Sequence, residues 1–460
     1  MTPRGPAFGL SAELRTQLLE RQASRRTTQA ETAPATPPRL PPRPPLGDPQ
    51  IRQELQRIRD AGRILGIDNP FFRPHDGIAG AETSIEGRML LNMVSYNYLG
   101  LNGDARVHAA AEAALRRYGC SVSASRLVSG ERPVHRELES ALAEWHATED
   151  CLALVSGHAT NVTAIGHLVG AGDAIVHDAL AHNSVLQGAM LSGAQRVPFP
   201  HNDVAALDRA LASLRPRAKR VLVVVEGHYS MDGDVPDLPA LVEVVQRNGA
   251  WLMVDEAHSV GVLGATGRGV AEHFGIDPAG VDIWMGTLSK TLCGCGGYIA
   301  GSRDLVEYLR CSAPGFVYSV GMPPPVAAAA IAALGIMRAE PWRVERLHEN
   351  AALFLREAQA AGLNTGASIG AAIVPVILGS SIKAARVADL LFRRGINAQP
   401  ILHPAVPERS ARLRFFLSSL HGPAQIRTAV AETARAVAEV ERMKLDIAGL
   451  AARLGAARQG

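Results

Sequence analysis

The chain has 460 residues, of which 47% are hydrophobic and 20% are charged, and its formal net charge is +3. These values are ordinary for a globular protein with room for one large and one small domain. A net charge this small, without a basic stripe carrying interleaved aromatic residues, gives no support for a nucleic acid partner. No apolar run is long enough to span a bilayer, and the N-terminus lacks the apolar core of a signal peptide.

The cysteines indicate the cellular compartment. Five are scattered along the chain without a CxxC pair: Cys120, Cys151, Cys293, Cys295 and Cys311. This pattern argues for a reducing environment and against a disulfide framework or a zinc site. We therefore expect a cytoplasmic protein with no metal and no membrane span.

The N-terminal region of residues 1–47 differs in composition from the rest of the chain. Positions 33–46 are dense in proline and predict an extended linker. Residues 10–22 place three leucines at helical spacing, which predicts a short amphipathic helix. A short helix on a tether suits docking to a partner, and its LSxExRxxLLERQ pattern loosely resembles linker segments of modular peptide and polyketide synthases. The alternatives are a disordered tail and a mitochondrial targeting sequence, the latter disfavoured by its glutamates.

The remaining chain divides into three parts. Residues 48–105 form an N-terminal arm that begins with an amphipathic helix over residues 51–64. We assign residues 106–335 to a large domain and residues 336–460 to a small C-terminal domain that mixes strands and helices. An alanine-rich helical stretch, residues 326–355, is expected to bridge the two domains.

A single lysine follows a predicted buried strand in residues 282–300. The stretch begins with apolar, β-prone residues and then places Lys290 in a loop of small residues and glycines. An ammonium group is costly to bury, so a lysine here loses its proton readily, and the neutral amine is the form that makes Schiff bases. The functional interpretation is a Schiff base between Lys290 and pyridoxal phosphate (PLP). The alternative is a surface lysine at a strand end.

A second strand end supports the functional interpretation. The apolar run of residues 251–254 predicts a buried parallel strand, and Asp255 follows at its C-terminal end, where open α/β sheets place ligand-binding groups. PLP needs a carboxylate against its pyridinium nitrogen, because a protonated nitrogen makes the ring an electron sink. It also needs a hydrogen-bond partner for its ring hydroxyl, and His258, three residues on, can supply one.

The sequence VDEAHSVGVLG, followed by GTLSKTLCGCGGYIAG, resembles the α-oxoamine synthase family of fold-type I PLP enzymes. The resemblance runs from about residue 93 to about residue 421, through several motifs in the order of the family. It implies an α/β fold with a mostly parallel seven-stranded sheet, helices on both faces and a smaller C-terminal α/β domain, in a homodimer. Members of the family condense a small amino acid with an acyl thioester and release carbon dioxide, which gives an α-aminoketone.

The resemblance implies a set of cofactor contacts. SGHATN matches the SGxxxN motif of the family, and this glycine turn at a helix start implies that the backbone of Gly157, His158 and Ala159 cradles the PLP phosphate. His182 of LAHNS matches the histidine that stacks on the PLP ring and helps with proton transfer; the alternative is a surface histidine at a helix start. Ser230 of EGHYSMDGD matches a serine that lies close to the cofactor hydroxyl.

Two further hydroxyl groups are implied at the phosphate. Thr287 of GTLSK is expected to bind the phosphate through its side chain. YSVGMPP resembles a family loop in which a serine and a threonine reach the phosphate of the PLP in the other subunit. This chain keeps Ser319 but has Val320 where the threonine is usual, so only one of these two contacts across the dimer is implied.

The resemblance also implies a site for the amino acid. In the RxR pair of the family, the second arginine binds the amino acid carboxylate, which maps to Arg414 of RLRFFL, with Arg412 as the fallback. A guanidinium group suits bidentate capture of a carboxylate, although either arginine can instead be a surface residue of an edge strand. SYNYLGL resembles another family element, in which Asn97 and the aromatic residues either wall the substrate entrance or pack in the core. HNDVAAL, residues 201–207, resembles the HND element and is expected to cap a helix.

The resulting hypothesis is an acyltransferase whose catalytic residues are Lys290, His182, Asp255 and His258. The amino acid is glycine, alanine or serine, the usual choices of the family, and the donor is acyl-CoA or, given the N-terminal segment, an acyl carrier protein. One alternative is an aminotransferase of the same fold, in which lysine, aspartate and phosphate cradle look alike. The other is a docking or scaffold protein that has lost catalysis, which the presence of Lys290, Asp255 and His182 argues against.

Overall fold

The structure is a computed structural model that describes residue 20 and residues 46–443. It divides the chain into two compact units, residues 1–58 and residues 59–460. The predicted docking helix and the proline-rich stretch lie outside the described residues, apart from Glu20 and Leu46. The amphipathic helix predicted after them is confirmed as α2 (Pro49–Leu65).

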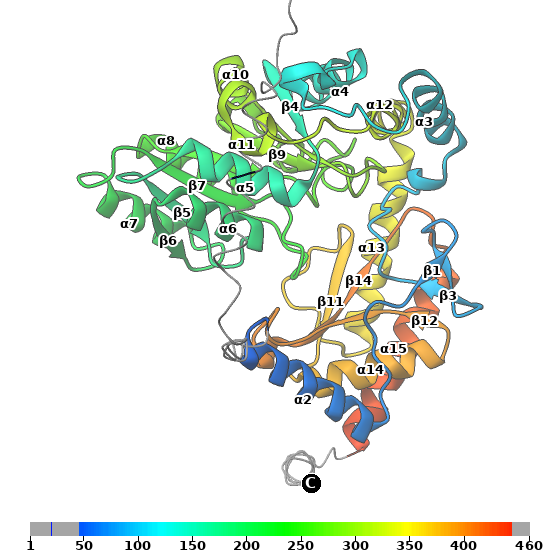
Figure 1. The fold of residues 1–460 in the computed structure, drawn as a ribbon. Helices are drawn as coiled ribbons and strands as arrows, with labels where there is room; N and C mark the ends of the chain where they lie inside the picture. Colours follow the sequence, from blue (N-terminus) through cyan, green and yellow to red (C-terminus); the bar gives the residue numbers. More distant parts are fainter. Residues whose placement is uncertain (1–19, 21–45, 444–460) are drawn as a thin grey trace, which may run out of the picture. The chain divides into compact units, whose positions relative to one another are not determined.

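A seven-stranded sheet forms the centre of the second unit (Figure 1). Its spatial order is β4-β10-β9-β8-β7-β5-β6, and only β10 runs antiparallel to its neighbours. The strands are β4 (Asp150–Leu154), β5 (Ala174–Asp178), β6 (Gln195–Phe199), β7 (Val221–Glu226), β8 (Trp251–Asp255), β9 (Ile283–Thr287) and β10 (Gly297–Gly301). The predicted mostly parallel sheet is therefore confirmed.

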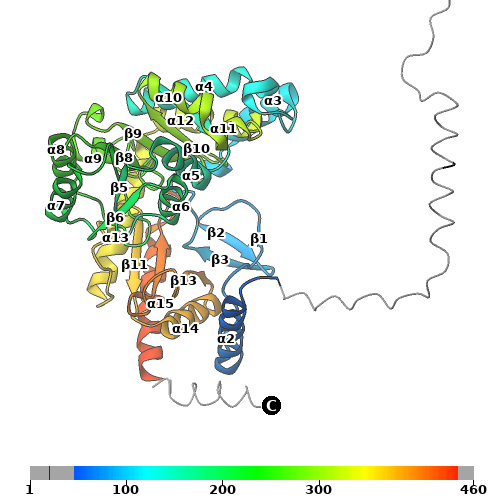
Figure 2. The same ribbon diagram turned by 60° about the vertical axis from the view of Figure 1, so that its left-hand side comes forward.

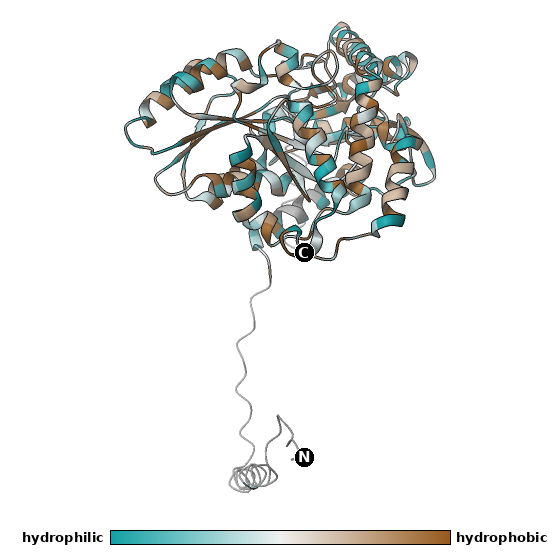
Figure 3. Cartoon of the chain, turned by 90° about the horizontal axis from the view of Figure 1, so that it is seen from above, coloured by the Kyte–Doolittle hydropathy of each residue, from teal (hydrophilic) through white to brown (hydrophobic). Residues whose placement is uncertain are grey.

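Successive residues of these strands point to opposite faces of the sheet, and each face has its own hydrophobic core. On one face, Leu222 and Val224 of β7 pack in a core with α5 (Gly157–Leu168), α6 (Asn183–Ser192), α10 (Arg303–Ser312) and α11 (Pro314–Val317). On the other face, Val223 and Val225 pack with α4 (Pro133–His146), α7 (Val204–Leu214), α8 (Leu238–Arg247) and α12 (Pro324–Ala339). Burial on both faces explains why these strands are continuous apolar runs. The helices are striped with hydrophobic and hydrophilic residues in Figure 3, as amphipathic helices should be.

The C-terminal part carries two smaller sheets (Figure 2). β11 (Ile373–Ile377), β14 (Arg412–Phe416) and β13 (Gln399–Ile401) form an antiparallel sheet, with α14 (Ser381–Arg393) and α15 (Pro423–Arg442) beside it. The N-terminal arm supplies β1 (His75–Asp76), β2 (Glu82–Ile85) and β3 (Arg88–Asn92), and β3 pairs in parallel with β12 (Ile396–Asn397). Strands from the arm and from the C-terminal part thus share one sheet.

Three further helices complete the ordered elements that bear on the site. α3 (Ala105–Tyr118) packs against α12, and α9 (Val270–Phe274) follows the loop after β8. α13 (Trp342–Ala360) packs against α15 and follows α12, so the predicted alanine-rich helical bridge is two helices. Within the described part of the chain, no helix combines the length and apolar character needed to cross a membrane.

Candidate active site

The candidate site lies at the carboxyl ends of three neighbouring strands. Glu226 ends β7 and is in register with Asp255, which ends β8, and Thr287 ends β9 beside them. Carboxyl ends of parallel strands meet at one edge of an open α/β sheet, which is where such folds bind ligands. Lys290 follows three residues after β9, so the local order of the chain brings the predicted lysine and aspartate to the same edge.

Lys290 is partly buried and lacks a polar partner. Its Nζ atom lies 5.7 Å from the centroid of the Tyr96 ring, and it makes no hydrogen bond or ion pair within residues 46–443. Loss of hydration lowers the pKa of Lys290 to about 8, although the carboxyl groups of Asp255 and Glu226 act in the opposite direction. An amine with this pKa is partly neutral near physiological pH, as Schiff base formation requires.

Asp255 is buried and held in place by two donors. Its Oδ2 atom accepts a hydrogen bond from Asn161 Nδ2 at 2.7 Å, and its Oδ1 atom accepts one from the Ala257 N–H at 2.9 Å. Asn161 lies in α5 and also donates to the hydroxyl of Ser184 in α6 at 2.9 Å. The carboxylate is therefore fixed by the helices that cover the sheet.

The same chain of hydrogen bonds sets the protonation of His182. Ser184 Oγ, which accepts from Asn161, lies 2.7 Å from His182 Nδ1. The Ser184 N–H donates to Nδ1, at 3.3 Å. Nδ1 is thus an acceptor, which leaves the ring proton on Nε2. Partial loss of hydration lowers the pKa of His182, and the neighbouring Lys290 cation adds to this, so the ring is neutral.

His258 is buried beside the same edge of the sheet. Its Nδ1 atom lies 2.8 Å from the Tyr98 hydroxyl, and its ring stacks on Phe416 with 6.4 Å between centroids. Burial lowers the pKa of His258 well below its usual value, so this ring is also neutral. Nε2 has no hydrogen-bond partner among the described residues and is the atom left for a ligand.

The N-terminus of α5 provides backbone donors. Ser156 Oγ caps the helix by accepting from the Ala159 N–H at 3.3 Å, whereas the N–H groups of Gly157 and His158 have no acceptor within the described chain. Two of the three predicted phosphate donors are therefore free, and the third is used by the cap. A Cβ atom on Gly157 would lie 2.6 Å from Thr287 Oγ1, so only glycine lets the helix approach β9 this closely.

The predicted hydroxyl groups differ in their placement. Thr287 Oγ1 donates to the Gly296 carbonyl at 2.9 Å and lies 2.7 Å from Ser289 Oγ, so Ser289 joins it beside the end of α5. Ser230 is buried, and its N–H points to Glu226 Oε2 at 3.4 Å. Ser319 lies in the loop after α11 and bonds only the Val320 carbonyl, at 3.3 Å, through its side chain. Within one chain it is not part of the group around Lys290.

The two arginines of β14 have different environments. Arg412 is buried and bonded through two of its nitrogens: Nη1 bonds Asp232 at 2.6 Å and the Met231 carbonyl at 3.0 Å, and Nε bonds the Ser410 carbonyl at 2.8 Å. Arg414 makes one short hydrogen bond, from Nη1 to the Ser230 carbonyl at 2.9 Å, and its Nε is buried without a partner. Arg414 thus has donors to spare and no carboxylate partner among the described residues, whereas the fallback Arg412 already pairs with the carboxylate of Asp232.

Asn97 differs from its prediction as a substrate-binding residue. It is buried, its Nδ2 donates to the Ala79 carbonyl at 2.8 Å, and its Oδ1 accepts from the Asn102 N–H at 3.1 Å. Both ends of the amide are used to hold the backbone, because a buried amide must be paired. The alternative of core packing fits the structure, and two other residues of this motif face the site: the Tyr96 ring lies against Lys290, and the Tyr98 hydroxyl bonds His258.

Three site residues were missed in the sequence: Glu226, Asn161 and Ser184. Burial, and next to it the charge of Asp255, raises the pKa of Glu226 to about 8, so this carboxyl is protonated near neutral pH. Asn161 and Ser184 are the last residues of SGHATN and LAHNS, motifs that point to this place. The contact between Asn161 and Asp255 joins positions far apart in the sequence, which no local pattern reveals, whereas Ser184 lies two residues from His182 in the same motif.

The residues present fit PLP. Lys290 is an unpaired amine, Asp255 a fixed carboxylate, and the end of α5 offers two free N–H groups beside the hydroxyl groups of Thr287 and Ser289. A helix N-terminus with free donors attracts phosphate, and a carboxylate suits a pyridinium nitrogen. The fold and these groups together define a PLP-dependent enzyme of fold-type I.

Comparison with known proteins narrows this class. The sequence profile of the aminotransferase class I and II family matches residues 88–433. An 8-amino-7-oxononanoate synthase from Geobacter sulfurreducens is 42% identical over 387 residues, which cover 84% of this chain and 97% of that protein. Another from Pseudomonas paraeruginosa is 42% identical over 347 residues, 75% of this chain and 86% of that protein. A serine palmitoyltransferase from S. paucimobilis, solved with a bound PLP–myriocin aldimine, has a TM-score of 0.82 at 31% identity and covers 86% of this chain.

The chain therefore belongs to the aminotransferase class I and II family and, within it, to the α-oxoamine synthases. It is a PLP-dependent acyltransferase that condenses a small amino acid with an acyl thioester and releases carbon dioxide. The predicted family, fold class, cofactor and reaction are confirmed.

Proposed function

We propose that this protein joins alanine to an acyl thioester at Lys290 and releases an α-aminoketone. The observation that carries the proposal is a pair of groups at one site that are unmatched within residues 46–443: the Lys290 amine has no partner there, and Arg414 Nε is buried without one. Arg414 is close enough for its charge to lower the pKa of Lys290 further. An amine-binding group and a carboxylate-binding group side by side suit an amino acid.

The choice of alanine comes from the names of the relatives. An 8-amino-7-oxononanoate keeps a methyl group and an amine-bearing carbon beyond its ketone, which are the parts of alanine that remain after its carboxylate is lost. The other seven carbons then come from a dicarboxylic acyl thioester. Relatives with this name are 42% identical to this chain, whereas the similar serine palmitoyltransferase is 31% identical.

The side chains divide the chemistry between them. PLP, when bound, supplies an electron sink that stabilises negative charge on the α-carbon. Arg414 binds the carboxylate, and the neutral form of Lys290 takes the α-proton. Asp255, held by Asn161, favours a protonated ring nitrogen, and His258 is placed to bond the ring hydroxyl through Nε2.

His182 completes the condensation. It carries a proton on Nε2 that it can donate to the oxygen of the thioester carbonyl as the carbon–carbon bond forms. The carbon–sulfur bond then breaks and the thiol leaves. Loss of the carboxylate as carbon dioxide leaves a carbanion that takes up a proton, which Lys290 can return to the α-carbon.

An absorbance titration tests this proposal. The PLP-loaded protein receives glycine, alanine and serine in separate experiments, followed by an acyl thioester. We expect the cofactor band to shift at the lowest concentration with alanine, and a further long-wavelength band to grow only after the thioester is added. Conversion to the pyridoxamine form with release of a keto acid would instead indicate an aminotransferase. A protein that binds no PLP would indicate a scaffold.

The proposed assembly is a homodimer. Large apolar side chains are exposed on the turn at residues 126–130 and on the loop that it adjoins, with Val128 80% exposed and Tyr318 86% exposed. A contiguous patch of this kind typically forms an interface. Ser319 lies in this patch, which suits the proposed contact with the phosphate in the partner subunit. Light scattering after Val128→Asp should show dissociation; an unchanged mass would contradict this interface.

The proposed donor is an acyl chain on a carrier protein, docked by the segment at residues 10–22. This part of the proposal depends on the sequence alone, through the leucine spacing ahead of the proline-rich linker. Deleting residues 1–45 should reduce activity with an acyl carrier protein and leave activity with acyl-CoA intact. Equal loss with both donors, or no loss with either, would contradict the docking role.

A further inference from the structure

An ion triad lies beside the active site and includes none of the residues discussed above as catalytic. The His201 ring lies between two carboxylates, with Nδ1 2.9 Å from Asp178 Oδ1 and Nε2 2.8 Å from Asp234 Oδ2. Asp178 ends β5, His201 follows β6, and Asp234 lies in the loop after β7. Asn202 also bonds both aspartates: its N–H donates to Asp178 at 2.9 Å, and its side-chain amide donates to Asp234 at 3.0 Å.

The geometry requires His201 to be charged. Both ring nitrogens face carboxylate oxygens, which only accept, so both nitrogens carry hydrogen. Burial alone would lower the pKa of His201, but Asp178 and Asp234 raise it to about 10. The other titratable group that faces the ring is Tyr229, whose ring meets it edge-on with 4.5 Å between centroids. The triad is thus a cation held between two anions at neutral pH.

The loop that contains Asp234 also holds the arginines of β14. We call residues 229–234 the bridging loop. The Ser230 carbonyl accepts from Arg414 at 2.9 Å, and the Met231 carbonyl accepts from Arg412 at 3.0 Å. At its far end, Gly233 has φ +71°, and a Cβ atom there would lie 2.1 Å from the Ile373 carbonyl. The loop is therefore fixed by the triad on one side and by the C-terminal sheet on the other.

The position of Arg414 depends on this loop. Its hydrogen bond to Ser230 is short, whereas its contacts with Met231 Sδ and the Tyr96 hydroxyl are longer, at 3.4 Å and 3.5 Å. A shift of the Ser230 carbonyl would thus move the guanidinium group, because the described residues make no other short hydrogen bond to it. A misplaced guanidinium group loses the bidentate geometry on which carboxylate capture depends.

We infer that His201 is a positioning residue for the amino acid carboxylate: through Asp234 it fixes the bridging loop, whose Ser230 carbonyl orients Arg414. The inference rests on the proposed role of Arg414. His201 is not needed for the helix cap that the HND motif predicts, because Asp203 caps α7 by accepting from the Ala206 N–H at 2.8 Å. Nor is it placed as an acid or base, since both of its nitrogens are occupied.

The test compares two ligands that differ only in the carboxylate. Alanine and ethylamine are titrated into the PLP-loaded His201→Gln protein, and the absorbance of the cofactor gives each dissociation constant. We expect alanine to bind roughly tenfold more weakly, the loss typical of one hydrogen bond to a charged group, and ethylamine to bind as before. Equal effects on both ligands, or on neither, would overturn the inference.

Two further variants keep the test decisive. Asp234→Asn removes the same ion pair with less change in shape and should give the same selective loss if His201→Gln does not fold. Arg220→Gln is the control, because it breaks an ion pair with Asp173, 2.6 Å long, at the opposite ends of the strands, and should change neither constant. A selective loss in this control would show that general destabilisation explains the effect.

The Arg414→Gln variant distinguishes a failure of the positioning role of His201 from a failure of the proposed carboxylate-binding role of Arg414. A selective loss of alanine in this variant, but not in His201→Gln or Asp234→Asn, would overturn the positioning role and leave the proposed function intact. No selective loss in Arg414→Gln would overturn both, because the carboxylate would then be bound elsewhere.

Discussion

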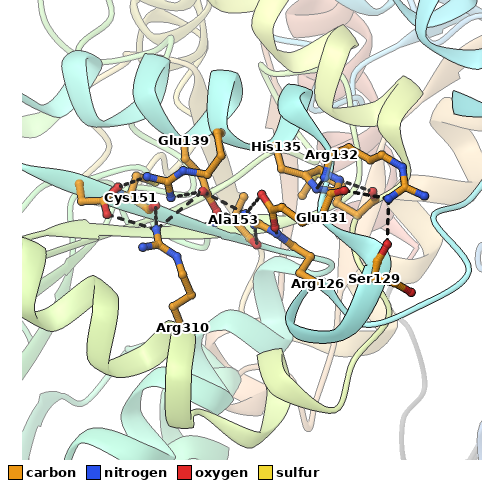
Figure 4. A network of polar contacts seen from close by, with 12 residues as sticks. Arg126, Ser129, Glu131, Arg132, His135, Glu139, Cys151, Ala153 and Arg310 are labelled. Atoms are coloured by element: carbon orange, nitrogen blue, oxygen red, sulfur yellow. Dashed lines mark hydrogen bonds and ion pairs between the residues drawn. The ribbon is translucent and has the colours of Figure 1, made fainter. Parts of the chain in front are cut away.

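Two clusters of buried charge differ in whether their charges are paired. In the first, the Glu139 carboxylate lies among three guanidinium groups, with Arg126 at 2.5 Å, Arg136 at 2.7 Å and Arg310 at 3.8 Å. Arg126 also pairs with Glu131 at 2.6 Å (Figure 4). Every charge in this cluster therefore meets an opposite charge, and the cluster joins α4, β4 and α10.

The second cluster, around Lys290, contains polar atoms that have no partner among the described residues. Lys290 has no partner within the described chain, Arg414 Nε is buried without one, and so is Asn161 Oδ1. Buried polar groups in native proteins are nearly always hydrogen-bonded, so unmatched ones require an explanation. The comparison teaches that burial and charge do not by themselves identify a functional site. Several unmatched groups gathered at one edge of the sheet do, because a ligand can supply what the chain omits, whereas a single unmatched atom such as Arg310 Nε in the first cluster does not.

The sharpest test of this comparison is the removal of the lysine. Lys290→Ala should abolish turnover, because both the attachment point of the cofactor and the α-proton base are lost. Borohydride reduction followed by peptide mass spectrometry should find the cofactor on Lys290 in the unaltered protein and on no lysine in the variant. Lys219→Ala, at an exposed position, is the control. A cofactor adduct that persists in Lys290→Ala would identify another lysine as the anchor.

Breaking the paired cluster should affect stability and spare the site. Glu139→Gln removes the carboxylate that three guanidinium groups share. We expect the free energy of unfolding to fall by roughly 3 kcal/mol, because buried charges lose their partner. Denaturant titration measures this loss, and the affinity for PLP should stay unchanged. Glu144→Gln, which removes a mostly exposed ion pair with Arg338, should cost less than about 1 kcal/mol. Similar losses in the two variants would contradict the distinction between the clusters.

The two arginines of β14 show the same contrast within one strand: Arg412 pairs with a carboxylate, and Arg414 does not pair with one among the described residues. Arg414→Gln should raise KM for the amino acid roughly tenfold to a hundredfold, since charged hydrogen bonds to the carboxylate are lost, with little change in the unfolding midpoint. Arg412→Gln breaks a buried ion pair with Asp232 and should lower the midpoint. Steady-state kinetics and thermal unfolding of both variants check this. A raised KM in Arg412→Gln together with a lowered midpoint in Arg414→Gln would show instead that Arg412 binds the substrate.

The smallest effect is a gain in stability. The pKa of Lys290 falls from its usual 10.5 to about 8 in the fold, so the folded state is penalised below pH 8 and the penalty vanishes above pH 10.5. Lys290→Met should therefore stabilise the cofactor-free protein at pH 7 by roughly 2 kcal/mol, and this gain should fade as the pH rises. Unfolding midpoints measured across this pH range test the prediction. A gain that does not change with pH would point to packing instead of charge.

The sequence predicted those parts of the site that depend on local order. Lys290 and Asp255 follow apolar strands, and the ends of parallel strands meet, so their meeting follows from the fold class. The free backbone donors at the start of α5 follow in the same way from a glycine turn. The mostly parallel sheet was predictable because its strands, buried on both faces, are continuous apolar runs.

The parts that were missed depend on contacts between distant positions. Arg412 and Arg414 are two residues apart and share one face of β14, so the strand pattern cannot distinguish them. They differ because Asp232, about 180 positions away, pairs with only one of them. The substrate-binding role of Asn97 stays a prediction, and its side-chain amide bonds the backbone of Ala79 and Asn102, which the motif alone does not show. The helix cap expected of the HND element is made by Asp203, but the sequence does not show that His201 lies between two carboxylates.

The central claim is that carbon dioxide leaves the amino acid only when an acyl group is transferred to it. We would incubate the PLP-loaded protein with carboxyl-labelled alanine and short-, medium- and long-chain acyl-CoA esters, including dicarboxylic ones, and measure labelled carbon dioxide and free thiol together. The account predicts that both appear in equal amounts with at least one ester and that neither appears without an ester. Labelled pyruvate in place of carbon dioxide, or carbon dioxide without release of thiol, would contradict it.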